Sequence, residues 1–157
     1  MNGKKLSPAS IVILAGGAVI FLASFLAFYK YNAPKVSFGS VTVGGTTTWS
    51  AWSKGASFPL SILPALFGLV MALQVALTAF ANVSLPSRVL GFDWTQIHLV
   101  LGIQAALLML CFLIRDSSVL DFGVGFWFML LASIALLVGA VMRTQESPSE
   151  AGAPPAL

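Results

Sequence analysis

Residues 94–114 read WTQIHLVLGIQAALLMLCFLI, an apolar run long enough to cross the hydrocarbon core of a bilayer, which takes about 20 residues. Backbone groups in hydrocarbon must be hydrogen bonded within their own segment, so this run is predicted to be a helix. It holds the chain's single histidine, His98, and its single cysteine, Cys111, together with Gln96 and Gln104. We therefore expect the other apolar runs of the chain to pack around this helix.

The composition indicates a lipid environment. Hydrophobic residues make up 58% of the 157 residues and charged residues only 8%. A soluble domain typically carries about 25% charged residues, so most of this surface is expected to face lipid. The formal net charge of +3 is confined to loops and tails, which argues against a nucleic-acid surface because that would need a basic patch.

Three further apolar runs have comparable length, so the predicted fold is an all-α polytopic membrane protein with four transmembrane helices. The expected spans within one transmembrane domain, 11–142, are residues 11–29, 60–81, 94–114 and 122–142. Residues 1–10 are expected to form a short N-terminal tail. The polar segment 143–157 contains three prolines and is expected to be a disordered C-terminal tail.

The one long loop, residues 30–58, is predicted to contain a β-hairpin. Two β-prone arms flank Gly44-Gly45, which is typical of a hairpin turn, and Gly39-Ser40 predicts a bulge. Because a lone hairpin is marginal in water, Trp49 and Trp52 are expected to rest on the membrane surface or on the helix ends. Two interpretations of these tryptophans stay open: ordinary interfacial anchors, or a lid that contacts a partner.

Small residues predict one close helix pair. Gly16, Ala23 and Ala27 share a stripe on the first helix, and Gly125, Ala132 and Gly139 repeat every seven residues on the fourth. Small side chains let helices approach closely in lipid, so these two helices are expected to pack tightly.

Two glutamines predict a contact between the second and third helices. Gln74 and Gln104 lie at similar depth in an antiparallel pair, and a buried amide needs a partner, so we expect them to face each other. The cluster of Gln74, Gln104 and His98 is interpreted either as structural hydrogen bonding or as a polar path through the membrane.

The polar inventory excludes several chemistries. One histidine cannot provide bis-histidine haem ligation, and one cysteine cannot build a multi-cysteine metal site or a Cys-x-x-Cys pair. The predicted helix interiors hold no Asp, Glu, Lys or Arg, which disfavours proton-coupled transport. His98, Asp93 and either Ser84 or Ser87 supply the residue types of a catalytic triad, but no spacing in the sequence indicates that they meet. No catalytic residue, cofactor or metal is therefore predicted, and no enzyme is expected.

Three motifs carry a resemblance: Gly16-Gly17 in the first helix, Trp49-Ser50-Ala51-Trp52 before the second, and Gly123-Val124-Gly125 at the entry to the fourth. With them the chain resembles the uncharacterised small four-helix integral membrane proteins of actinobacterial type, a group that implies no particular activity. The layout is also similar in plan to claudin-like proteins, but their loop cysteine pair is absent here and that match is rejected.

These observations favour a non-catalytic role. The predicted function is an accessory or scaffold subunit that binds another membrane protein or envelope component through Trp49 and Trp52. The alternative is a small oligomeric channel or transporter that uses Gln74, Gln104 and His98. The expected location is the cell (plasma) membrane, multi-pass, with both termini cytoplasmic; the expected partners are the lipid bilayer and either another membrane protein or a second copy.

Overall fold

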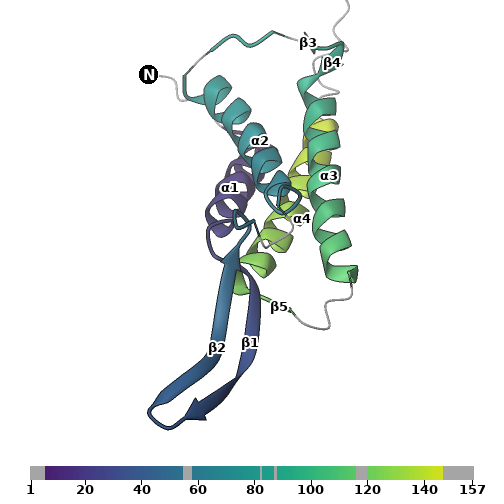
Figure 1. Cartoon of the computed structure of the whole chain (residues 1–157). Coiled ribbons are helices and arrows are strands. Elements are labelled where there is room, and N and C mark those ends of the chain that lie inside the picture. Colours follow the sequence, from purple (N-terminus) through teal and green to yellow (C-terminus); the bar gives the residue numbers. More distant parts are fainter. Residues whose placement is uncertain (1–5, 55–57, 82, 87, 116–119, 147–157) are drawn as a thin grey trace, which may run out of the picture.

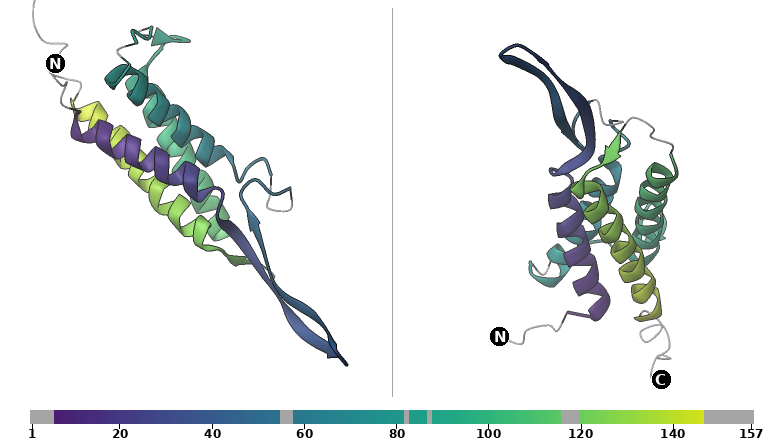
Figure 2. Two further views of the ribbon diagram at one scale, coloured as in Figure 1. Left: turned by 90° about the vertical axis from the view of Figure 1, so that its left-hand side faces the viewer. Right: turned by 90° about the horizontal axis from the view of Figure 1, so that it is seen from below.

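The computed structural model describes residues 6–54, 58–81, 83–86, 88–115 and 120–146. Its helices are α1 (Pro8–Ala23), α2 (Leu63–Ala79), α3 (Trp94–Ile114) and α4 (Val124–Glu146). The strands are β1 (Ala27–Phe38), β2 (Val41–Ser50), β3 (Arg88–Val89), β4 (Phe92–Asp93) and β5 (Asp121–Phe122). The helices run alternately up and down in a bundle, and the β1–β2 hairpin projects from one end of it, as Figure 1 and Figure 2 show.

The prediction of a four-span, all-α fold is wrong. Within the described residues, only α3 and α4 are long and apolar enough to cross a membrane. Helices α1 and α2 have 16 and 17 residues and reach roughly 24–26 Å at 1.5 Å per residue, short of a core about 30 Å thick. The chain also forms a three-stranded sheet, β2-β1-β5, and a two-stranded sheet, β3-β4.

The first apolar run was misjudged because only part of it is helical. The helix begins at Pro8 behind the N-cap Ser7 and ends at Ala23, where the Ser24 hydroxyl donates to the Phe21 carbonyl at 2.6 Å. Three residues later the chain enters β1, although residues 27–29 were expected to complete the helix. The high apolarity of residues 11–29 therefore predicted burial but did not predict where the helix ends.

The predicted hairpin is present, but its turn and bulge are exchanged. The turn is Gly39-Ser40, and Gly39 has a φ of +64°. The predicted turn, Gly44-Gly45, lies inside β2, and the bulge is on β1, where Pro34 and Lys35 together face Gly44. A Cβ on Gly44 would collide with the Pro34 carbonyl, so this close approach needs a glycine.

The predicted close contact between the first and fourth helices is confirmed. A Cβ on Gly16 would lie 3.3 Å from Leu136 of α4, and a Cβ on Gly139 would lie 2.9 Å from Ile13 of α1. A second close approach joins α1 to α2, because a Cβ on Gly17 would lie 2.5 Å from the carbonyl oxygen of Gly68. Small residues thus let α1 pack tightly against two neighbours.

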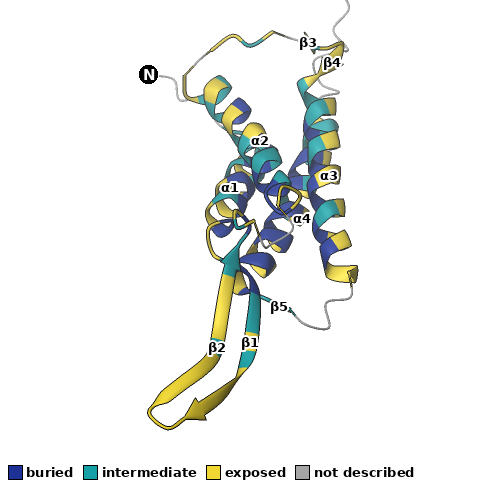
Figure 3. Ribbon diagram, in the orientation of Figure 1, coloured by how far each residue is buried: buried dark blue, intermediate teal, exposed yellow. Residues whose placement is uncertain are grey.

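An aromatic cluster joins the hairpin to the bundle. A second irregularity in β1, at Phe28, lets the consecutive residues Phe28 and Tyr29 both point into the core. The Phe28 ring meets Tyr29, Phe112 and Phe126 edge to face at centroid distances of 4.9–5.5 Å. Figure 3 shows the buried core concentrated in the helices and the distal hairpin fully exposed.

The third helix has the predicted bounds, and the fourth is longer than predicted. At the start of α3, Asp93 and Gln96 form a capping box in which the Gln96 amide oxygen accepts from the Asp93 backbone N–H at 3.2 Å. Helix α4 continues through Arg143 to Glu146, residues that were assigned to the disordered tail. Residues 147–157 of that predicted tail lie outside the described part of the chain.

Candidate functional site

Three polar side chains from three helices meet at the end of the bundle that is opposite the hairpin. Arg143 of α4 donates from Nη1 to the Gln74 side-chain oxygen on α2 at 3.3 Å and to His98 Nδ1 on α3 at 3.2 Å. His98 is 0% exposed and Gln74 is 5% exposed, while Arg143 is half-buried. We call Gln74, His98 and Arg143 the polar cluster.

The guanidinium determines the tautomer of the histidine. Arginine can only donate, so His98 Nδ1 is the acceptor and Nε2 carries the ring hydrogen. Among the described residues His98 Nε2 has no hydrogen-bond partner, and the ring edge lies near Trp94, with a centroid distance of 6.5 Å. Nδ1 is thus occupied and the ring is enclosed, so His98 is not placed to act as a general base on an external substrate.

Gln104 does not belong to the polar cluster. Its side chain is exposed on the outer face of α3, whereas Gln74 points inward to Arg143. The predicted Gln74–Gln104 contact is therefore wrong, and the three residues proposed for a polar path do not line one path in a single copy of the chain. Sequence reasoning missed Arg143 because it ended the helix one residue earlier.

The fourth helix also meets the start of α1 near the polar cluster. The Ala9 backbone N–H donates to the Glu146 carboxylate at 3.3 Å, where the positive end of the α1 dipole favours an anion. Arg143 and Glu146 thus connect the last turn of α4 to the other three helices. The arrangement holds helix ends together and supplies no nucleophile.

The two predicted tryptophans lie at the base of the hairpin. Trp52 donates from Nε1 to the Ser24 hydroxyl at 2.9 Å and stacks on Phe25 with a centroid distance of 5.4 Å. Trp49 is half-buried, pairs with Tyr29 across the strands and packs on the core. The expectation that they rest on helix ends is confirmed, and both side chains serve to fix the hairpin on the bundle.

The distal end of the hairpin has one apolar and one polar face. Cross-strand pairs Val36–Val43 and Phe38–Val41 place four apolar side chains on one face, which we call the tip face. These side chains are 46–72% exposed. On the other face the paired Ser37 and Thr42 hydroxyls lie 3.2 Å apart and hydrogen bond to each other.

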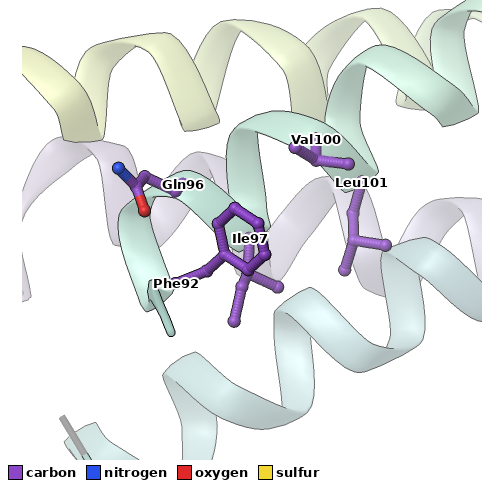
Figure 4. Close-up of a pocket in the computed structure, with 5 residues that line it drawn as sticks. All are labelled: Phe92, Gln96, Ile97, Val100 and Leu101. Carbon is purple, nitrogen blue, oxygen red and sulfur yellow. The ribbon is translucent and has the colours of Figure 1, made fainter. Parts of the chain in front are cut away.

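A small pocket lies on the outer side of the first turns of α3. It is lined by Phe92, Gln96, Ile97, Val100 and Leu101 and has a volume of about 170 Å³ (Figure 4). Ligand sites for drug-sized molecules usually measure about 300–1,000 Å³ and offer convergent polar groups. Gln96 is the one polar side chain that lines this pocket, and its amide oxygen already accepts from the Asp93 backbone, so the pocket offers no convergent set of polar groups.

The described residues contain no group of three or more histidine, cysteine, aspartate or glutamate side chains that could hold a metal ion. Cys111 is exposed on α3. A scan against models of protein families finds no match to this chain, and a search of curated proteins finds no similar sequence. The resemblance to the actinobacterial membrane proteins therefore stays a prediction.

Proposed function

We propose that this protein is a non-catalytic accessory or scaffold subunit of the cell membrane that presents the β1–β2 hairpin to another envelope component. Helices α3 and α4 would cross the bilayer as an antiparallel pair, with α1 and α2 packed against them. Only 33% of the most apolar 18-residue stretch of α3 is buried inside the bundle, which leaves most of that stretch to face lipid.

The single observation that carries the proposal is that the hairpin combines a fixed base with an exposed apolar far end. Its base is held by Trp49, Trp52 and the Phe28 cluster, so the projecting strands have a fixed attachment. Its far end exposes the tip face, whose apolar side chains lie outside the buried core of the described residues. Exposed apolar patches on an ordered scaffold are typical of interaction sites.

The composition of the hairpin, rather than the positive charges, sets the proposed orientation, because each side would hold four Lys or Arg residues. Both the start of α1 and the end of α4 lie at the end of the bundle that carries Arg143, and the hairpin lies at the other. A hairpin rich in threonine and tryptophan suits an extracytoplasmic location, so we place both termini in the cytoplasm.

The test is cross-linking and affinity purification from native membranes. The unaltered protein is expected to recover one envelope component, protein or lipid, and a variant with Phe38→Ser and Val41→Ser is expected to lose it. A matched variant, Ser37→Ala with Thr42→Ala on the opposite face, should retain recovery. Equal recovery by all three proteins would refute a role for the tip face.

The same preparation tests the channel alternative. If the purified protein forms homo-oligomers that pass ions across liposomes, and Gln74→Leu abolishes that flux, the scaffold proposal is wrong. The exposed position of Gln104 already weakens the channel alternative, because its polar path would have to form between copies of the chain.

A further inference from the structure

We propose that the tip face docks on an anionic lipid surface other than the bilayer crossed by α3 and α4. This inference rests on the proposed function, because it names the envelope component that the hairpin meets. Four features of the described hairpin support it: its reach, the depth of its apolar face, the pairing of its polar groups and its charge.

The reach separates the tip from the protein's own bilayer. Tyr29 is 3% exposed and belongs to the core of the bundle, and Phe38 lies nine residues further along β1. At about 3.3 Å per residue the tip stands roughly 30 Å from that core. Figure 2 shows the hairpin leading away from the helix ends, so the tip points away from the part of the bundle that would lie in the protein's own bilayer.

The depth of the apolar face matches an interfacial insertion. Phe38–Val41 and Val36–Val43 form the last two facing pairs before the turn, about 7 Å along the strands. Amphipathic segments that lie on membranes bury their apolar face by about 5–10 Å. On the opposite face, Ser37 and Thr42 hydrogen bond to each other, which lowers the cost of approaching lipid.

The charge favours anionic lipid. Between Tyr31 and Thr48, Lys35 is the single charged residue, and it immediately precedes Val36. Lys30 lies nearer the base, where it registers with Asp121 of β5, so it is not at the tip. A lysine just behind an inserted apolar tip lies at headgroup level, where it contributes about 1 kcal/mol, or about fivefold in affinity, on an anionic surface.

The size of the face disfavours a protein occupant. Stable protein interfaces bury about 800 Å² on each partner, contributed by some 20–30 residues. The tip face offers four side chains. The bulge at Pro34–Lys35 and the lysine itself also blunt the strand edge against pairing with a further strand.

The experiment places the full-length protein in nanodiscs of neutral phosphatidylcholine and adds acceptor vesicles that are neutral or contain 30% phosphatidylglycerol. We expect the anionic vesicles to capture the nanodiscs about fivefold better than the neutral ones. Phe38→Ser with Val41→Ser should reduce capture at least tenfold, and Lys35→Ser should remove the preference for anionic vesicles. Ser37→Ala with Thr42→Ala is the matched control and should leave capture unchanged.

A second measurement reports insertion directly. In a Phe38→Trp variant, brominated acceptor lipids should quench fluorescence, whereas the four native tryptophans of the unaltered protein should stay unquenched. Absence of capture or of quenching would overturn the lipid inference. If native membranes nevertheless yield a tip-dependent protein partner or a second copy, the lipid inference fails and the proposed function stands. If no tip-dependent partner of any kind is found, both fail.

Discussion

Replacing Arg143 by methionine is predicted to lower the free energy of unfolding by about 2–4 kcal/mol. The substitution keeps the length and much of the packing of the side chain but removes the donor shared by Gln74 and His98. A buried acceptor left without its partner costs roughly 1–3 kcal/mol, and hydrogen bonds between helices at membrane depth contribute about 0.6–2 kcal/mol each. Two such acceptors, 5% and 0% exposed, give the predicted range.

A double-mutant cycle isolates the contact. His98→Leu removes one of the orphaned acceptors, so the variant with both substitutions should be about 1–2 kcal/mol more stable than the sum of the single losses predicts. The measurement is reversible unfolding by SDS in mixed micelles, followed by tryptophan fluorescence. Lys54→Met, at an exposed position before α2, is the control and should change stability by less than about 0.5 kcal/mol.

The result that refutes this reasoning is additivity. If the two single losses add within about 0.5 kcal/mol, Arg143 and His98 are not coupled and the polar cluster does not join the three helices. A loss from Arg143→Met no larger than that from Lys54→Met would lead to the same conclusion.

Three further predictions use the same unfolding measurement. Phe28→Ala should cost about 3–5 kcal/mol because the ring is fully buried, whereas Phe25→Ala, at 56% exposure, should cost about 1 kcal/mol or less; equal losses would contradict the position of β1 in the core. Gln74→Leu should destabilise by about 1–2 kcal/mol and Gln104→Leu by less than about 0.5 kcal/mol; the reverse order would mean that the rotation of α3 is wrong. Gly17→Ala should cost about 1–3 kcal/mol because the new Cβ would lie 2.6 Å from a side chain of α2, and a neutral effect would mean that the two helices are further apart.

Part of the fold could be predicted because local signals were strong. The α3 bounds follow from an uninterrupted apolar run preceded by Asp93 and Gln96, a pair that specifies where the helix begins. The hairpin follows from two β-prone arms that flank Gly44-Gly45, although the turn itself is at Gly39-Ser40. The contact between α1 and α4 follows from small residues at helical spacing.

The errors share a physical cause: composition reports burial better than it reports conformation or direction. The run that contains Phe28 is buried partly as helix and partly as strand, and its residues look alike in either state. Helix α3 is apolar on all sides, so nothing in its pattern distinguished the face of His98 from the face of Gln104.

The polar cluster illustrates the same limit. Arg143 was assigned to a tail because it follows an apolar run, yet one more helical turn brings its guanidinium between α2 and α3. The sequence around Arg143 does not show that α4 continues for this last turn, because the turn is stabilised by packing against the other helices. A basic residue just after an apolar run can thus belong to the last turn of the helix and point into the bundle.

The alternating course of the four helices has a consequence for how the molecule would communicate. Ala9 and Glu146 meet at one end, and Phe28 and Gly123 meet at the other through a 2.8 Å backbone hydrogen bond. The hairpin and the polar cluster would then lie on opposite sides of the membrane, facing different compartments. Any mechanical signal received by the strands would reach the opposite compartment only along the helices, and the close glycine contacts between α1 and α4 provide one such route.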